Sequence, residues 1–478
     1  MEKRSGYITV YLALTLGILI SLITTMLYGI RVHTIRFETE CSMDMGLDSI
    51  FAEYNREMLS RYGLLFIDSS YGGSVPSADY TKSQLLYYMN LNFDHKGAGV
   101  FSKDLTGLNA DNAFLEGVSY ASDNSGEVLR YQIVQYIKSK YGVGVADDML
   151  NNMVDMDSLL GKYDSYARQR EEAEEKVRSI VDDANSKKDK DDDPVTISNP
   201  ADSVDKLSSS NALYFALGDK TNLNMNAINL NSYISKRGYT NGAGLRSTQT
   251  KADGLVSKAI IEKYIFNKCG YYDHERAGSA LNYQIEYIIK GQDSDLKNLE
   301  KIAEDIFKTR YVINMAYLMT DTAKQAEAEV IATIAACLLL LPELIDAIKL
   351  TILFAWGYVE SAKDLRMLFA GNNLPIVKNS GNWNTPLYQL IGYRRYLDDY
   401  KVAGGELSYE TYLAGFLALE NTDKMTMRLC DIMEMDIRQT PGNGNFMMDG
   451  QIYQLTAEVN VSSKYGYGCN IRRFYTYE

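Results

Sequence analysis

The most continuous run of hydrophobic positions extends from residue 7 to residue 30 and contains no charged side chain. A helix over this run is about 36 Å long, and the hydrocarbon core of a bilayer is about 30 Å thick. The run is longer than the apolar region of a signal peptide, and its exit offers no small-x-small cleavage motif. Tyrosines stand near both ends, as is typical of membrane interfaces: Tyr7, Tyr11 and Tyr28. We therefore expect residues 7–30 to form a retained transmembrane helix.

The charges on either side of this span indicate an orientation. Basic side chains are balanced, with Lys3 and Arg4 before the span and Arg31 and Arg36 after it. The amino-terminal amine favours a cytoplasmic N-terminus, as do the acidic residues after the span: Glu38, Glu40 and Asp44. We expect residues 1–6 to lie in the cytoplasm and the bulk of the chain on the extracytoplasmic side of the cell membrane.

Apolar residues with helical spacing continue beyond the span: Leu47, Ile50, Tyr54 and Met58. The chain contains no proline before Pro76, and Gly63 is a natural helix stop. We expect one long helix over residues 7–62, whose outer part forms a stem as in pilin-like proteins. The alternative is two helices with a break near Gly46.

The clearest strand pattern lies near the C-terminus, where apolar residues occupy every second position: Tyr453, Leu455, Ala457, Val459 and Val461. A turn at residues 464–468 leads to a second strand over 469–477, and such a hairpin needs further strands for stability. The partners that we expect are the short apolar segments at 64–67 and 113–121. The predicted fold is therefore α+β, with a small antiparallel sheet that joins the N- and C-terminal parts around a large helical insertion.

A second apolar block, residues 330–359, is interrupted by Pro342. Reading it as one membrane span would bury three charged residues near its centre, at a cost of about 8 to 10 kcal/mol on insertion scales: Glu343, Asp346 and Lys349. Proline fits the first turn of a helix. We expect two helices that meet at Pro342, the second ending at Gly371, in the core of a soluble bundle.

Residues 168–193 carry mostly charged side chains and almost nothing to bury, which predicts a solvated helix and then a flexible linker. From this segment and the patterns above, we expect four parts in the chain beyond the span. They are a stem helix with a first α+β part (31–165), the charged helix and linker (166–199), a mainly helical domain (200–430) and a C-terminal β-hairpin (431–478).

Composition and motifs exclude several classes of function. The net charge of -13 and the pI of about 5.0 argue against nucleic acid as a partner. Five cysteines occur singly, so no disulfide framework can be derived, and three histidines lack the spacing of a zinc site. No nucleophile elbow, phosphate loop or dinucleotide fingerprint occurs. We predict no metal and no cofactor.

The N-terminal sequence Arg4-Ser5-Gly6-Tyr7-Ile8-Thr9-Val10-Tyr11-Leu12 resembles the start of TadE/TadG-like proteins, minor pilin-like components of tight-adherence (Flp-type) pili. The resemblance implies a prepilin-type cleavage site between Gly6 and Tyr7. Family members often carry Glu five residues after that site, where this chain has Tyr11. We therefore expect a permanently anchored accessory protein rather than a polymerising subunit.

Residues 281–289 and 355–361, with Asp364-Leu365-Arg366, resemble a branch of large single-anchor proteins found beside such pilus genes in Gram-positive bacteria. These segments are packing motifs and imply no catalytic residue. We expect Glu360, Asp364 and Arg366 to pair with each other or with a neighbouring helix, as a structural charge cluster.

The resulting hypothesis is a non-enzymatic structural or interaction protein of a tight-adherence-type pilus or a related surface assembly. Its expected partners are the lipid bilayer and pilus or pilus-assembly proteins, with a homo-oligomer as a further possibility. The alternatives are a surface adhesin, a ligand-sensing module and, as the weakest, an extracytoplasmic hydrolase that would need acidic residues converging in a cleft.

Overall fold

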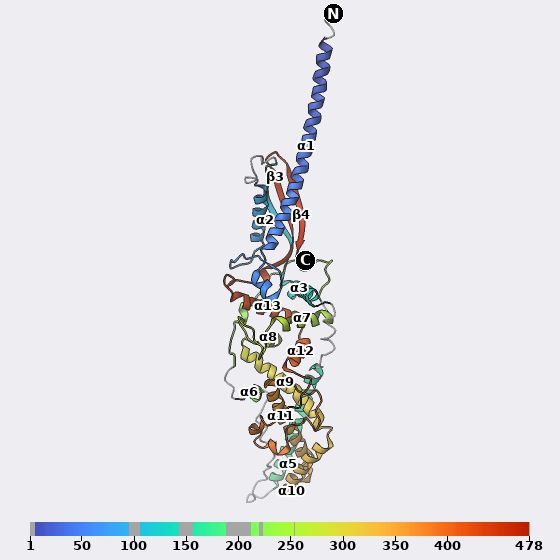
Figure 1. The fold of residues 1–478 in the computed structure, drawn as a ribbon. Coiled ribbons are helices and arrows are strands. Elements are labelled where there is room, and N and C mark those ends of the chain that lie inside the picture. Colours follow the sequence, from blue (N-terminus) through green and yellow to red (C-terminus); the bar gives the residue numbers. More distant parts are fainter. Residues whose placement is uncertain are drawn as a thin grey trace. The chain divides into compact units, whose positions relative to one another are not determined.

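A computed structural model describes residues 5–94, 106–142, 156–187, 212–218, 223–252 and 254–477. Residues 1–4 of the predicted cytoplasmic segment and residues 188–199 of the predicted linker lie outside these ranges. The chain forms two compact units: unit 1 contains residues 1–140, 231–252 and 430–478, and unit 2 contains residues 141–230 and 253–429. The α+β class, with one small antiparallel sheet and a long apolar N-terminal helix, is confirmed (Figure 1).

The first helix of unit 1, α1, is continuous over Ser5–Ala52 and has no break at Gly46. Gly46 allows close packing here, because a Cβ would lie 3.1 Å from the side chains of Leu85 and Met89 and would require them to shift. Its apolar N-terminal part is long and hydrophobic enough to cross a membrane, and no other helix in the described ranges meets the same test. Side chains from Tyr7 to Leu27 are exposed.

The helix ends ten residues before the predicted end at 62, so the prediction for residues 53–62 is wrong. Backbone pairing replaces the helix there, because Asn55 donates its N–H to the carbonyl of Phe66 at 3.0 Å and Tyr54 forms an isolated bridge with Ile67. The Asn55 side chain then accepts the N–H of Met58 at 3.0 Å and opens a π-helical turn, Met58–Tyr62. Gly63 stops this turn with a φ of 72°.

The sheet of unit 1 has four strands, with β3 (Gln451–Ser463) at its centre. One edge of β3 pairs antiparallel with β2 (Leu108–Tyr120), and the other pairs with β4 (Gly468–Thr476) and the two-residue β1 (Ile67–Asp68). Val459 lies opposite Ala113 on one side and Ile471 on the other. The sheet therefore joins segments from both ends of the chain, as predicted.

The core of unit 1 lies between this sheet and the two helices α1 and α2 (Ala78–Phe93). The alternating residues of β3 face it, together with apolar side chains of both helices: Met43, Leu47, Ile50, Leu85, Met89, Leu455, Ala457, Val459 and Val461. Unit 1 also contains α3 (Asp123–Tyr141) as far as residue 140, the 3-10 turn η4 (Leu230–Ser232) from residue 231, and the 3-10 turn η8 (Met448–Gly450).

Unit 2 is helical, and α11 (Ile345–Phe369) is buried along most of its length. The helices of this unit are α5 (Met156–Ser186), α6 (Ala212–Leu217), α7 (Leu255–Lys268), α8 (Gln284–Lys290), α9 (Asp295–Leu318), α10 (Thr322–Leu339) and α12 (Tyr409–Leu419). Short 3-10 turns occur at Pro342–Leu344 (η5), Leu387–Leu390 (η6) and Tyr393–Tyr396 (η7). Helix α13 (Thr422–Arg438) is divided between the two units at residue 430.

The apolar block around Pro342 forms two helices, as expected. Pro342 begins the 3-10 turn that separates α10 from α11, and Gly371 follows the end of α11 with a φ of 84°. The two units alternate along the chain instead of following one another. Unit 2 already includes α5, which begins at Met156, and the chain then returns to unit 1 for residues 231–252.

Candidate functional site

The predicted stem residues occupy two kinds of position. Leu47 and Ile50 are fully buried on the sheet side of α1, and Met58 is buried in the π-helical turn. Tyr54 is half-buried and lies in the bridge with Ile67 rather than on a helix. The stem residues therefore pack into unit 1, although Tyr54 and Met58 lie beyond the end of α1.

Polar and aromatic contacts extend this packing along the length of the stem. Near the end of α1, the Phe51 ring lies 4.5 Å from the ring of Tyr475, and its carbonyl accepts the hydroxyl of Tyr477 at 2.7 Å. Where the apolar span ends, the Tyr28 ring lies 5.3 Å from that of Tyr467, and the Arg31 guanidinium lies 4.2 Å from the centre of the Tyr465 ring.

The predicted cleavage residues, Gly6 and Tyr7, lie in the first turns of α1. The Tyr7 side chain is exposed.

The predicted charge cluster is centred on α11 in unit 2. Glu360 and Asp364 are fully buried, one helical turn apart, and share the ammonium group of Lys378 at 2.6 and 2.7 Å. Arg310 of α9 donates to the second oxygen of Asp364 at 3.0 Å, and Thr385 donates its hydroxyl to Glu360 at 2.6 Å. Two buried cations therefore balance two buried carboxylates.

These contacts decide the charge state of the cluster. Burial alone would raise the pKa of Asp364, but Arg310 and Lys378 hold it below its ordinary value. The carboxylates are fixed by ion pairs and hydrogen bonds from α9 and from the segment after α11. The arrangement fits a structural cluster that fastens this segment to α11.

The prediction was wrong about Arg366, which does not take part in this cluster. Its side chain is partly exposed and pairs at 3.5 Å with Asp398, whose side chain is 80% exposed. On a helix, residues two positions apart point in different directions, so Arg366 cannot share a face with Asp364. The cations that the sequence pattern did not identify are Arg310 and Lys378, which lie 54 and 14 residues from Asp364.

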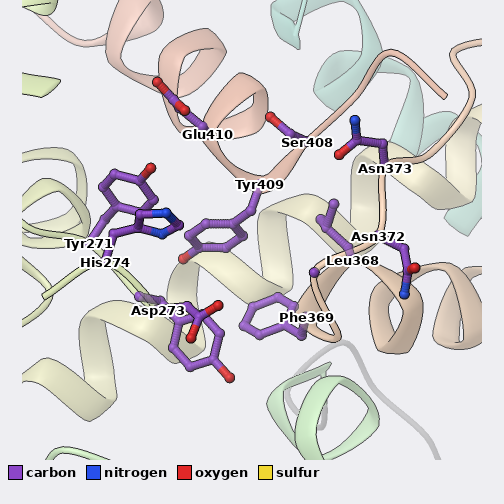
Figure 2. Close-up of a pocket in the computed structure, with 12 residues that line it drawn as sticks. Tyr271, Asp273, His274, Leu368, Phe369, Asn372, Asn373, Ser408, Tyr409 and Glu410 are labelled. Carbon is purple, nitrogen blue, oxygen red and sulfur yellow. The ribbon is translucent and has the colours of Figure 1, made fainter. Parts of the chain in front are cut away.

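A separate pocket in unit 2 combines aromatic rings with acidic side chains (Figure 2). It forms where three segments meet: the turn at residues 271–274, the C-terminal end of α11 with the residues after it, and the start of α12. We call it the aromatic pocket, and its lining residues are Tyr271, Tyr272, Asp273, His274, Leu368, Phe369, Gly371, Asn372, Asn373, Ser408, Tyr409 and Glu410.

The turn that supplies half of the pocket is fixed by its backbone. Tyr271 and His274 exchange backbone hydrogen bonds of 3.3 and 2.8 Å, and Asp273 adopts a φ of 65° inside the turn. Aspartate is among the few non-glycine residues that tolerate this conformation. Gly270 precedes the turn because a Cβ there would come within 3.0 Å of the backbone of Arg276. The Tyr271 ring consequently stacks on the His274 ring at 4.7 Å.

The opposite side of the pocket is set by the start of α12. Ser408 caps this helix by accepting the N–H of Thr411 at 3.1 Å, which places Tyr409 at its first position. The Tyr409 hydroxyl donates to Glu286 of α8 at 2.8 Å, and the same oxygen accepts the N–H of Tyr272 at 2.8 Å. The buried Glu286 thus holds two walls of the pocket together.

The electrostatic environment of the pocket is acidic. Burial, followed by the neighbouring Glu410 carboxylate, raises the pKa of Tyr271 to about 12. Burial raises the pKa of Glu286 to about 7, although its hydrogen bonds act in the opposite direction. No lysine or arginine is among the lining residues.

Sequence reasoning did not identify this pocket, because its members come from three segments that no periodicity connects. The density of tyrosines around residue 271 was the signal that the sequence offered. In the described ranges, no group of three or more His, Cys, Asp or Glu side chains is arranged to hold a metal ion.

Comparisons with known proteins give one match. No curated protein and no solved structure matches the chain. A family model described as a family of unknown function (DUF5702) matches residues 189–463, which is more than half of the chain. The matched range includes the charge cluster of α11, the aromatic pocket and strand β3. The chain therefore belongs to the DUF5702 family.

Proposed function

We propose that this protein is a single-pass membrane protein whose bulk lies outside the cytoplasm and which acts as a structural or interaction component of a tight-adherence-type pilus or a related surface assembly. The observation that carries the proposal is helix α1. Its apolar part exposes its side chains, and the same helix continues without a break into the core of unit 1, where Leu47 and Ile50 are buried. Such a helix is both an anchor and a structural part of a folded domain.

The proposed role requires no catalysis. The acidic residues singled out by the sequence, Glu360 and Asp364, are fully buried and paired with cations, which fits support of the fold. The partners that we propose are the lipid bilayer around residues 7–30 and pilus or pilus-assembly proteins around the outer units. A homo-oligomer is compatible with this role, whereas the net charge of -13 disfavours nucleic acid.

The proposed orientation can be tested with the exposed Cys337 of α10. A membrane-impermeant thiol reagent added to intact cells should label the protein, and Cys337→Ser should remove most of this labelling. The remaining cysteines are a built-in comparison, because Cys269 and Cys430 are buried and Cys41 and Cys469 are half-buried. Labelling that appears only after lysis would contradict the orientation.

The proposed assembly role needs a separate experiment. Crosslinking in intact cells, followed by purification of the protein and identification of the attached chains, should recover pilus or pilus-assembly components. Recovery of none of them would overturn this part of the proposal. The mass of the purified protein also reports on processing, since a permanently anchored accessory protein keeps the residues before Tyr7.

A further inference from the structure

The aromatic pocket has the lining of a site for a positively charged ligand. Four rings follow one another around it: Tyr272 lies 5.2 Å from Phe369 and 5.9 Å from Tyr409, and Tyr409 lies 5.2 Å from Phe369 and 6.4 Å from Tyr271. The face of an aromatic ring carries negative potential, which attracts a cation within about 6 Å of the ring centre. Several rings around one pocket add their attractions.

The charged groups at the rim have the complementary sign. Asp273 and Glu410 are exposed, and in Figure 2 their carboxyl groups lie on either side of the Tyr409 ring. The lining itself contains no lysine or arginine. Arg276 lies near enough to lower the pKa of Tyr271, but by less than Glu410 and Glu286 each raise it. The net potential in the pocket therefore disfavours an anionic ligand, and a neutral apolar ligand would make no use of the carboxylates. A cation satisfies both the rings and the rim.

The size of the pocket restricts the ligand further. Its volume is about 160 Å³, and a cavity of about 150 Å³ in another protein holds one benzene molecule. A small substituted ammonium ion fits this volume, whereas a whole nucleotide or sugar chain is too large for it. Aromatic faces accept only weak hydrogen bonds, so they suit an ammonium whose hydrogens are replaced by methyl groups better than a primary amine.

We propose that the aromatic pocket of unit 2 binds a small quaternary ammonium group, such as that of choline. The rings of Tyr271, Tyr409 and Phe369 contact the methyl groups, and Asp273 and Glu410 supply the opposite charge. Glu286 acts as a positioning residue, because its hydrogen bonds fix Tyr409 and the backbone of Tyr272. This inference is independent of the role in surface assembly and makes unit 2 a ligand-binding part of the protein.

The test uses the full-length protein in maltoside micelles, which contain no choline headgroup. Choline and tetramethylammonium are titrated while binding is followed by calorimetry and ligand-observed NMR. The control ligand is the neutral isostere of choline in which carbon replaces the nitrogen. We expect saturable binding of both cations and at least about tenfold weaker binding of the isostere. Absence of saturable binding, or equal binding of the isostere, would overturn the proposal.

Variants at the exposed rim keep the test independent of folding. The double variant Asp273→Asn, Glu410→Gln should bind choline several-fold more weakly. Its affinity for choline should also depend much less on salt concentration than that of the native protein, and its unfolding temperature should be unchanged. Glu343→Gln removes one exposed charge at the opposite end of α11 and should bind as the native protein does. Tyr271→Leu should weaken binding by about tenfold. Native affinity in both the rim double variant and Tyr271→Leu would contradict the site.

A further pair of ligands distinguishes the source of the ammonium group. Glycerophosphocholine carries the headgroup of a lipid, whereas choline is a free solute. Comparable affinity for both supports recognition of choline attached through phosphate, and binding of choline alone supports a free solute. Both results support the pocket as a quaternary ammonium site.

Discussion

Glu286 shows how a single buried carboxyl group can make the stability of unit 2 depend on pH. Its two hydrogen-bond donors, the N–H of Tyr272 and the hydroxyl of Tyr409, are neutral, and its side chain is fully buried. Burial therefore favours the protonated form and raises its pKa from the ordinary value of 4.5 to about 7. A raised carboxyl pKa means that the folded protein holds this proton more tightly than the unfolded chain does.

The first prediction follows from that difference. The stabilising contribution of the Glu286 proton is complete below pH 4.5 and is lost as the pH rises through about 7. Glu286→Gln keeps an acceptor for both donors but cannot ionise. We expect equal stability of the variant and the native protein near about pH 4 and a gain of up to roughly 3 kcal/mol for the variant near about pH 8.

Urea unfolding of the full-length protein in detergent at these two pH values measures the effect. Glu343→Gln, at an exposed position, is the control and should leave the pH dependence unchanged. If Glu286→Gln and the native protein lose the same amount of stability when the pH is raised, Glu286 is not the group that causes the pH dependence.

The second prediction separates the buried charge cluster from its exposed neighbour. Lys378→Met removes the ion-pair partner of the buried Glu360 and leaves only the more weakly coupled Lys363 near it, which costs about 3 to 5 kcal/mol. Arg366→Met removes a cation from the same region but breaks only a partly exposed pair with Asp398, so the loss should stay below about 1 kcal/mol. Adding Glu360→Gln to Lys378→Met should restore part of the stability.

Chemical denaturation of the three variants, compared with the native protein, provides the measurement. A loss for Lys378→Met below about 1 kcal/mol, as small as the one expected for Arg366→Met, would mean that the two lysine contacts do not stabilise the fold. The sequence suggested Arg366 because it is near Glu360 and Asp364 along the chain. The actual partners were not predictable, since Arg310 and Lys378 reach the cluster only after α9 and the segment beyond α11 pack against α11.

At the scale of elements, the predictions succeeded where a periodicity was long and failed where tertiary hydrogen bonds override it. The alternation in β3 and the proline between α10 and α11 were sufficient to place those elements. The end of α1 could not be derived from the apolar spacing, because Asn55 leaves the helix to pair with Phe66. The local pattern of residues does not predict such a partner, because Asn55 and Phe66 meet only in the folded protein.

The third prediction concerns the packing of α1 on the sheet. Ile50 is fully buried in the core that β3 and α2 complete, so Ile50→Asp places a carboxylate in an apolar environment and should destabilise unit 1 by roughly 3 to 5 kcal/mol. The apolar span at residues 7–30 is unchanged, and the variant should remain in the membrane fraction. It should become sensitive to protease near the C-terminal strands.

Met45→Asp is the matched control, because Met45 lies on the same helix with its side chain 46% exposed. Limited proteolysis of membranes that contain each variant compares the two positions directly. If Ile50→Asp were as resistant as the control, the stem would not depend on this contact and α1 would be only a tether.

At the scale of the whole molecule, the sequence predicted the class of the fold and an N-terminal helix long and apolar enough to cross a membrane, but it did not locate the aromatic pocket. The helix that is long and apolar enough to span a membrane was predictable, because a run of uncharged residues is a local property. The pocket depends on three segments, at residues 271–274, 368–373 and 408–410, that meet only in the folded unit 2. A site of this kind leaves no regular spacing in the sequence.

The last prediction concerns the height of unit 1 above the membrane. Tyr28 and Arg31 mark the end of the apolar span, and the turn between β3 and β4 contacts both of them through Tyr467 and Tyr465. Tyrosine and arginine favour the interface between hydrocarbon and water. With α1 in a bilayer, this turn therefore lies at the level of the lipid headgroups, and the sheet of unit 1 starts directly at the membrane surface.

Tyr465→Trp places a fluorescent side chain at that turn, and the protein in vesicles can then be treated with lipids that carry a quencher either at the headgroup or deep in the acyl chains. We expect the headgroup quencher to reduce the added fluorescence strongly and the deep quencher to reduce it weakly. The native protein provides the background, because its tryptophans, Trp356 and Trp383, lie in unit 2. A tryptophan introduced at the exposed Phe114 of β2 is the control for a position in the same sheet that does not contact Tyr28 or Arg31. The two positions should differ, because only the side chain at position 465 is held beside Arg31, where the span ends. Equal quenching of the two positions by the headgroup lipid, or no quenching at Tyr465→Trp, would place the turn away from the membrane surface.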